Sequence, residues 1–353
     1  MNRHRELRPT FMMTVDPLLG IFRLRNLFLG AALFALAFAA WSIYNIVHMP
    51  LKSYKGEFKP LSDDEKVLRQ NLAAHVNELS ITIGERNLDH YTALQSAADY
   101  IQTSLREFGY HPTTQTYTVN GRTVTNIAAQ IVGTGKPEEN IVIGAHYDSV
   151  TDTPGANDNA SGVAAVLELA RFFKSSRPNK TISFVFFANE EPPYFQTDEM
   201  GSLVYAKQLH QQGVHVAGMI AVETIGYYSD ARGSQHYPSL MSLFYPDTGN
   251  FIAFVGDPES RDLLHRCVRV FRESTNFPSE GAAPPPDTPG AGWSDHWSFW
   301  QQGWPAIMAT DTAPFRYRQY HRPQDTTDKL DFDKMARVVG GLKRVVENLA
   351  TQP

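Results

Sequence analysis

The chain of 353 residues is long enough for one large domain or two smaller ones, and its 42% hydrophobic content is typical of a globular protein with a sizeable core. The net charge of -5 and the pI near 6.2 exclude a strongly basic surface, so we expect no nucleic-acid partner. The single cysteine, Cys267, excludes an internal disulfide and a cysteine-rich zinc site, and we interpret it as a small buried apolar residue.

The first element is an uncharged apolar run at residues 27–47, about as long as a bilayer core is thick. Basic residues precede it, namely Arg3, Arg5, Arg8, Arg23 and Arg25. The positive-inside rule then keeps residues 1–26 in the cytoplasm and exports the rest to a periplasmic, extracellular or lumenal compartment. Two readings stay open, a single-pass anchor or a signal peptide cut near Ala37-Phe38-Ala39. We favour the anchor because the apolar run continues past that site.

A polar tether at residues 48–60 leads into one predicted domain, residues 61–353. Ser62 and Glu65 have the spacing of a capping box and begin a helical pattern that reaches residue 79. A second helical pattern ends at Gly109, and strand-like runs follow at residues 123–132 and 140–145.

Strands and helices then alternate along the chain. We expect strands at residues 181–188, 219–224, 251–255 and 305–309, and helices at 160–173, 201–211, 261–273 and 332–349. This pattern predicts an α/β fold, a three-layer αβα sandwich around a mixed, mainly parallel sheet. The proline-rich segment 280–293 is predicted as a long surface loop that overhangs a site.

Acidic and imidazole side chains follow the predicted strands, where ligand sites of open α/β sheets form. They are His146, Asp148, Asp158, Glu190, Glu191, Glu223 and His321. Carboxylates gathered in one place raise one another's pKa and resist burial unless a cation lies among them. Histidine and carboxylate ligands without cysteine favour zinc, with cobalt or manganese as alternatives.

The number of these side chains matches a two-metal site, which needs one shared carboxylate and two terminal ligands for each ion. Asp158 would bridge, His146 and Glu223 would hold one ion, and Glu191 and His321 the other. Glu190 is left as the general base, because a metal ion lowers the pKa of bound water toward about 7 and a nearby carboxylate can take the proton. Asp148 would accept the second imidazole N–H of His146 and fix its tautomer.

Neighbouring residues have plainer interpretations. Asp152 is expected at the surface, and Gly155 and Asn157 as turn residues that direct Asp158 back toward the strand end. Taken alone, Asp158 would also suit a helix cap. We expect a substrate pocket built by the loops at residues 192–200 and 280–293, in which Asp198 and Glu199 are interpreted as solvated loop acids.

Six segments together resemble the co-catalytic dinuclear zinc aminopeptidases of peptidase family M28: GAHYDS, PGANDNASGVAAVLELAR, FVFFANEE with its downstream MGS, AVETIGYY, WSDHWSF and YHRPQDTTDKLD. The resemblance covers roughly residues 88–349 and implies a zinc-exopeptidase fold of the phosphorylase/hydrolase-like type. It implies the same five metal ligands and the same role for Glu190, although many members have Asp where this chain has Glu223.

The resemblance also singles out three residues outside the ligand set. Tyr320 is similar to a tyrosine that hydrogen-bonds the tetrahedral oxyanion in some relatives, and without that analogy we would interpret it as a packing aromatic. Asp295 is a candidate outer acid of the site. His296 is interpreted as a packed loop residue and not as a ligand.

The function that follows is an exported, membrane-tethered aminopeptidase acting on peptides; the sequence gives no signal for its oligomeric state. A glutaminyl cyclase is one alternative, since such zinc acyltransferases resemble the chain around Asp158, Glu190 and Glu191, but cyclases tend to have Trp at the position of Tyr320. A carboxypeptidase of the same superfamily is a second. A non-catalytic receptor ectodomain disagrees with the complete ligand set, and Ser161 lacks the G-x-S-x-G surroundings of a nucleophilic serine.

Overall fold

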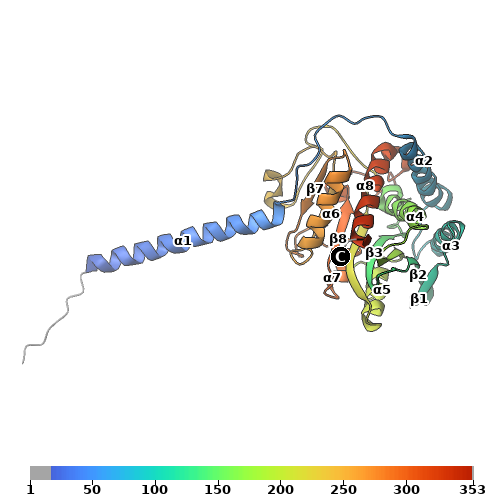
Figure 1. Ribbon diagram of the computed structural model, residues 1–353, viewed down its shortest axis with the longest axis horizontal. Coiled ribbons are helices and arrows are strands. Elements are labelled where there is room, and N and C mark those ends of the chain that lie inside the picture. Colours follow the sequence, from blue (N-terminus) through green and yellow to red (C-terminus); the bar gives the residue numbers. More distant parts are fainter. Residues whose placement is uncertain (1–16, 352–353) are drawn as a thin grey trace, which may run out of the picture. The chain divides into compact units, whose positions relative to one another are not determined.

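The computed structural model describes residues 17–351, and the chain divides into two compact units, residues 1–46 and 47–353. The first unit contains helix α1 (Pro17–Val47; Figure 1), in which the stretch Phe28–Val47 is long and apolar enough to cross a membrane. An N-terminal signal sequence meets the same criterion, so both readings of this segment stay open. Arg3, Arg5 and Arg8 lie outside the described residues.

The second unit is built on an eight-stranded sheet with the order β1-β2-β4-β3-β5-β8-β6-β7. Its strands are β1 (Thr113–Val119), β2 (Arg122–Ile131), β3 (Lys136–His146), β4 (Lys180–Phe187), β5 (His215–Glu223), β6 (Ile252–Gly256), β7 (Ser279–Ala282) and β8 (Ala306–Thr310). The four central strands β4, β3, β5 and β8 are parallel, and β2 and β6 join them antiparallel. The predicted mixed, mainly parallel sheet is confirmed.

Helices cover both faces of this sheet (Figure 1). They are α2 (Asp63–Asn77), α3 (Tyr91–Glu107), α4 (Gly162–Phe173), α5 (Gly201–Gln211), α6 (Arg261–Ser274), α7 (His296–Trp300) and α8 (Phe332–Thr351). One hydrophobic cluster joins α2, α3, α4, α6 and α8 to one face, and a smaller cluster joins α5 and α7 to the other. The predicted three-layer αβα sandwich is therefore confirmed.

Local sequence explains the two most buried elements of the sandwich. Every residue of β4 (KTISFVFF) is buried, as expected for an apolar strand between two helical layers. Helix α4 is buried along nearly its whole length because small and apolar residues occupy almost all of its positions. The predicted capping box starts α2, where Ser62 accepts the Glu65 N–H and Glu65 accepts the Ser62 N–H.

The sequence prediction missed three elements: β1, β7 and α7. β1 (TTQTYTV) is an edge strand whose side chains are mostly polar and solvent-facing, so it lacks an apolar run. β7 takes the first residues of the proline-rich segment, and the prediction of a loop was wrong there. α7 has only five residues, too few for a helical period to show.

Residues 48–60, which the sequence predicts as a polar tether, are part of the second unit and pack within it. Met49 is buried at β7, and Arg272 of α6 donates hydrogen bonds to the carbonyls of Pro50 and Leu51 at 3.0 and 2.9 Å. Ser53 accepts the Ser279 N–H at 3.0 Å. The domain therefore begins its packing within two residues of the apolar stretch.

Candidate metal centre

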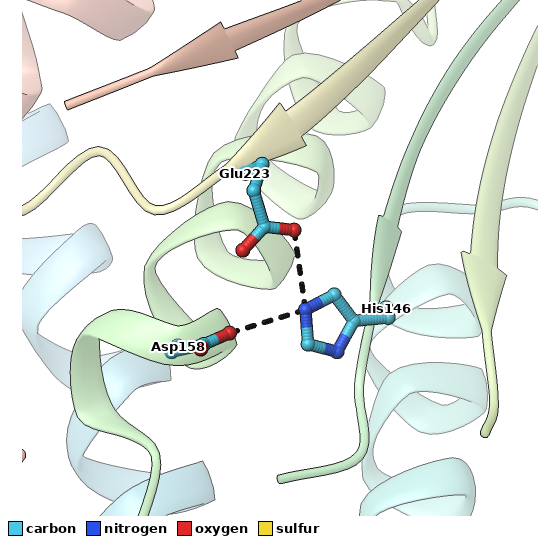
Figure 2. Close-up of side chains that lie close together, drawn as sticks. All are labelled: His146, Asp158 and Glu223. Carbon is cyan, nitrogen blue, oxygen red and sulfur yellow. Dashed lines mark ion pairs between the residues drawn. The ribbon is translucent and has the colours of Figure 1, made fainter. Parts of the chain in front are cut away.

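His146, Asp158 and Glu223 meet at the carboxyl ends of the central strands (Figure 2). His146 is the last residue of β3, Glu223 the last of β5, and Asp158 lies in the turn before α4. His146 Nε2 is 3.2 Å from Asp158 Oδ1 and 3.2 Å from Glu223 Oε2. All three side chains are buried.

A second trio shares Asp158. His321, in the loop after β8, places its Nε2 3.1 Å from Asp158 Oδ2 and 3.2 Å from Glu191 Oε2. Glu191 follows β4 and is buried, whereas His321 is partly exposed. The two oxygens of Asp158 thus face two different histidines, which is the arrangement of a bridging carboxylate.

The donor atoms fit metal ions better than they fit one another. Within the described residues, His146 Nε2, Asp158 Oδ1 and His321 Nε2 are buried and make no hydrogen bond. Two ligand atoms at about 2.0 to 2.1 Å from one tetrahedral zinc would lie roughly 3.3 Å apart, close to the 3.1 and 3.2 Å separations here. Buried nitrogen and oxygen atoms that lack hydrogen bonds and have this spacing are consistent with two sites of the size of a zinc ion.

Without a metal ion the site is electrostatically frustrated. Burial, reinforced by Asp158, raises the pKa of Glu191 to about 7. Burial lowers the pKa of His321, but the carboxylates of Asp158 and Glu191 close to its Nε2 outweigh burial and raise the pKa to about 10. Burial likewise opposes the charge of His146, and the surrounding carboxylates overcome it and raise its pKa well above 6.5. Divalent cations would replace these retained protons.

Glu190 lies beside the two trios without belonging to either. Its Oε2 is 3.8 Å from His146 Nε2, and burial raises its pKa well above 4.5. The Asp148 carboxylate accepts the backbone N–H groups of Glu190 and Glu191 at 3.2 and 3.1 Å and thereby fixes the backbone that carries both glutamates. Asp148 Oδ1 is also 3.3 Å from His146 Nδ1, the imidazole nitrogen that faces away from the ligand trio.

Tyr320 and Asp295 lie in the same region. The Tyr320 ring stacks on His321 with centroids 3.8 Å apart, and burial, with Asp158 and Glu191 nearby, raises the pKa of its phenol well above 10. Asp295 is fully buried, and burial raises its pKa to about 7. The adjacent Ser294 donates a 2.7 Å hydrogen bond to Glu223 Oε2.

The structure also shows the residues to which the sequence analysis gave no role in metal binding. Cys267 is buried, and Asp152 is exposed. His296 is buried, lies 2.7 Å from the Ala291 carbonyl and contacts Trp300 edge-on, so it is a packed residue as predicted. Gly155 has the positive φ of 60° that a turn residue needs. Asp198 is exposed and paired with Lys207 at 2.6 Å.

An apolar cavity adjoins the two trios. Glu223 and Tyr320 line one part of it, and the rest is largely apolar, including Met241, Phe251 and Phe315. It has about 840 Å³ of free space, part of it open to solvent. Two loops were predicted to build the pocket. Among the described residues, the loop at 280–293 lines the cavity and the loop at 192–200 does not. The loop at 192–200 instead contacts the loop at 280–293, where Gln196 donates a hydrogen bond to the Gly292 carbonyl at 3.1 Å.

Sequence reasoning missed three side chains that support the site. Asn159 donates to the Val222 carbonyl and accepts the N–H groups of Gly162 and Thr224, which ties the Asp158 turn to the end of β5. Arg86 and Asp325 are fully buried; Arg86 donates to the Gly155 carbonyl shortly before Asp158, and Asp325 accepts the N–H of Asp158 itself. For Asp325 a signal existed in the segment YHRPQDTTDKLD, but no role was assigned to it.

Three comparisons with known proteins bear on this geometry. The model of peptidase family M28 matches residues 126–345. The uncharacterized protein YfbL of Escherichia coli (strain K12) is 41% identical over 288 residues, which cover 79% of this chain and 88% of YfbL. A zinc aminopeptidase from Bacillus subtilis has a similar fold, with a TM-score of 0.66 at 15% identity over 80% of this chain and 95% of that chain.

A glutaminyl cyclase from Fimbriiglobus ruber also shares the fold. Its TM-score is 0.59 at 20% identity over 83% of this chain and 97% of that chain. Similarity at these identities concerns the fold, and a site grafted on one fold can serve several reactions.

Proposed function

The chain belongs to peptidase family M28, and on this premise we propose that it is a zinc aminopeptidase that removes N-terminal residues from peptides. One observation carries the proposal: two ligand trios share Asp158, and a further carboxylate, that of Glu190, lies beside them unused. A binding module has no need of such a spare base, whereas peptide hydrolysis does.

Zinc would be held by the five residues His146, Asp158, Glu191, Glu223 and His321, and when bound it would acidify water and polarise a carbonyl group. Glu190 is the residue that we propose takes a proton from the attacking water. The protonated carboxyl group of Glu190 would then give this proton to the leaving amine. Because the Tyr320 phenol stays protonated, it can donate a hydrogen bond to the oxyanion of the tetrahedral intermediate.

The apolar cavity supports a substrate class. It opens beside Glu223 and Tyr320, so it would receive a side chain next to the scissile bond. Its aromatic and aliphatic lining favours large apolar N-terminal residues over charged ones.

We also propose the arrangement in the cell that the sequence predicts. Residues 27–47 anchor the protein, residues 1–26 stay in the cytoplasm, and the peptidase domain at 61–353 is exported. The apolar stretch Phe28–Val47 supports the anchor, and the preceding arginines support the orientation.

A peptide panel tests the activity. Leu- or Phe-initiated peptides are supplied unblocked, blocked at the N-terminus or blocked at the C-terminus, and zinc is measured in the same protein. We expect cleavage of unblocked and C-blocked peptides, none of N-blocked peptides, and loss of activity on chelation. Cleavage that depends on a free C-terminus would identify a carboxypeptidase, and release of pyroglutamate from Gln-initiated peptides without free amino acid would identify a cyclase.

A further inference from the structure

The turn that carries Asp158 is fixed by charged side chains outside the ligand set. Asp158 has only one methylene group between its backbone and its carboxylate, so any backbone displacement moves both oxygens. The loop between β3 and α4 contains a short π-helical stretch, Ala156–Ser161, in which Asp158 and Asn159 have non-helical φ and ψ, so regular helical geometry does not fix the ligand. Its position must therefore be set by other contacts.

Arg86 ties the start of this loop to the residues shortly before Asp158. Its guanidinium is fully buried and donates to the carbonyls of Tyr147, Pro154 and Gly155 at 2.7, 2.6 and 2.8 Å. Tyr147 follows the ligand His146, and Gly155 lies three residues before Asp158. A planar fork of donors suits this task because its hydrogen bonds have fixed relative directions.

Asp325 holds the turn at the N–H groups of Asn157 and Asp158. One carboxylate oxygen accepts the Asn157 N–H at 2.9 Å, and the other accepts the Asp158 N–H at 3.0 Å. The Tyr317 hydroxyl donates to the same carboxylate at 3.0 Å. Since Asp325 lies four residues after the ligand His321, it also connects the His321 loop to the bridging ligand.

The charges of these two residues complement each other and the site. In the described part of the chain, all hydrogen bonds recorded for the Arg86 guanidinium go to backbone carbonyls, so its charge is not consumed by a direct ion pair. Burial lowers the pKa of Arg86, and of the surrounding carboxylates Asp148 and Asp325 oppose this most strongly. Burying a cation is costly unless opposite charges compensate it, and the carboxylates around Arg86 provide that compensation.

We propose that Arg86 and Asp325 are positioning residues that clamp the Asp158 turn and thereby set how well its carboxylate binds two metal ions at once. The proposal rests on the dinuclear site of the proposed function. Neither residue belongs to the two ligand trios; both act through the backbone that carries the bridging ligand.

Asp325→Asn tests the clamp with an almost isosteric change. The amide can accept only one of the two N–H groups and turns an N–H donor toward the other. The matched control is Asp328→Asn, because Asp328 is an exposed acid three residues further on. For the full-length protein in detergent, zinc affinity is measured by chelator competition, the visible spectrum is recorded after loading with cobalt(II), and the melting temperature is taken without metal.

We expect Asp325→Asn to fold and to bind the weaker of its two zinc ions roughly 10- to 100-fold less tightly, with an altered cobalt spectrum. Asp328→Asn should match the wild type in all three measurements. A purely structural role would lower the metal-free melting temperature but leave zinc affinity and the cobalt spectrum unchanged, and that result would overturn the proposal.

Arg86→Lys is the second variant, should Asp325→Asn fail to fold. Lysine keeps the positive charge but lacks the planar set of N–H donors of the guanidinium. Unchanged zinc affinity in folded Arg86→Lys would also contradict the clamp. A wild-type protein that binds fewer than two zinc ions would instead contradict the dinuclear site. The two failures are therefore distinguishable.

Discussion

Glu190 and Glu191 are neighbours in the chain, yet the structure gives their side chains different surroundings. Glu191 has one oxygen 3.2 Å from His321 Nε2 and the other 3.2 Å from the Val150 N–H, so both of its oxygens have defined partners. Glu190 Oε2, in contrast, lies 3.8 Å from His146 Nε2, a longer distance than either contact of Glu191. This contrast predicts different effects of the same substitution.

Glu190→Gln should retain zinc and lose about 10²- to 10⁴-fold in kcat, because the amide cannot take a proton from water. Glu191→Gln should lower the zinc content as well. Glu199→Gln, at an exposed loop position, is the matched control and should change neither quantity. Zinc is measured by elemental analysis and kcat with an unblocked peptide. Normal turnover in Glu190→Gln would refute its assignment as the base.

The residues of the site differ in how far the sequence could predict them. His146 and Glu223 end apolar strands and Glu191 comes shortly after one. Side chains of neighbouring strands converge at this edge of the sheet, and the structure brings the three residues together. Arg86 hydrogen-bonds backbone carbonyls more than sixty residues away, which leaves no pattern of residue types in the chain. Contacts between a side chain and a distant backbone depend on the fold and are not encoded locally.

Among the elements, the central strands were predictable and the edges were not. β3, β4 and β5 are apolar runs covered on both faces. β7 and the adjoining loop contain proline and glycine, so their place beside β6 depends on packing against Met49 and α6. The same edge of the sheet forms part of the apolar cavity, and the shape of this cavity could not be predicted from the sequence either.

The cavity gives a prediction about specificity. Ala253 of β6 lines it, so Ala253→Leu would fill part of its volume. We expect kcat/KM for a Phe-initiated peptide to fall by about 10-fold or more relative to an Ala-initiated peptide, since lost room for a few carbon atoms costs on the order of 1 to 3 kcal/mol. Ala231→Leu, at an exposed position outside the lining, should leave the ratio unchanged. An unchanged ratio in Ala253→Leu would exclude this cavity as the side-chain pocket.

For the molecule as a whole, the buried site ties folding stability to both pH and metal. Without metal, the pKa of Glu191 is raised from 4.5 to about 7 and that of His321 from 6.5 to about 10. In both cases the folded protein binds the proton more tightly than the unfolded chain does. Stability is therefore present at low pH and is lost as pH rises through these values, for Glu191 between 4.5 and 7 and for His321 between 6.5 and 10.

Metal-free protein should accordingly melt at a lower temperature at pH 8 than at pH 6, because Glu191 and His321 change stability in the same direction across that range. Zinc replaces the retained protons, so its stabilising effect should be larger at pH 8 than at pH 6. Thermal unfolding of the full-length protein with chelator and with excess zinc, at both pH values, measures the two effects. His321→Gln should weaken both trends, since it removes one of the groups with a raised pKa and one ligand. A zinc-induced shift in melting temperature that is equal at pH 6 and pH 8 would show that protons and metal ions do not compete for these side chains.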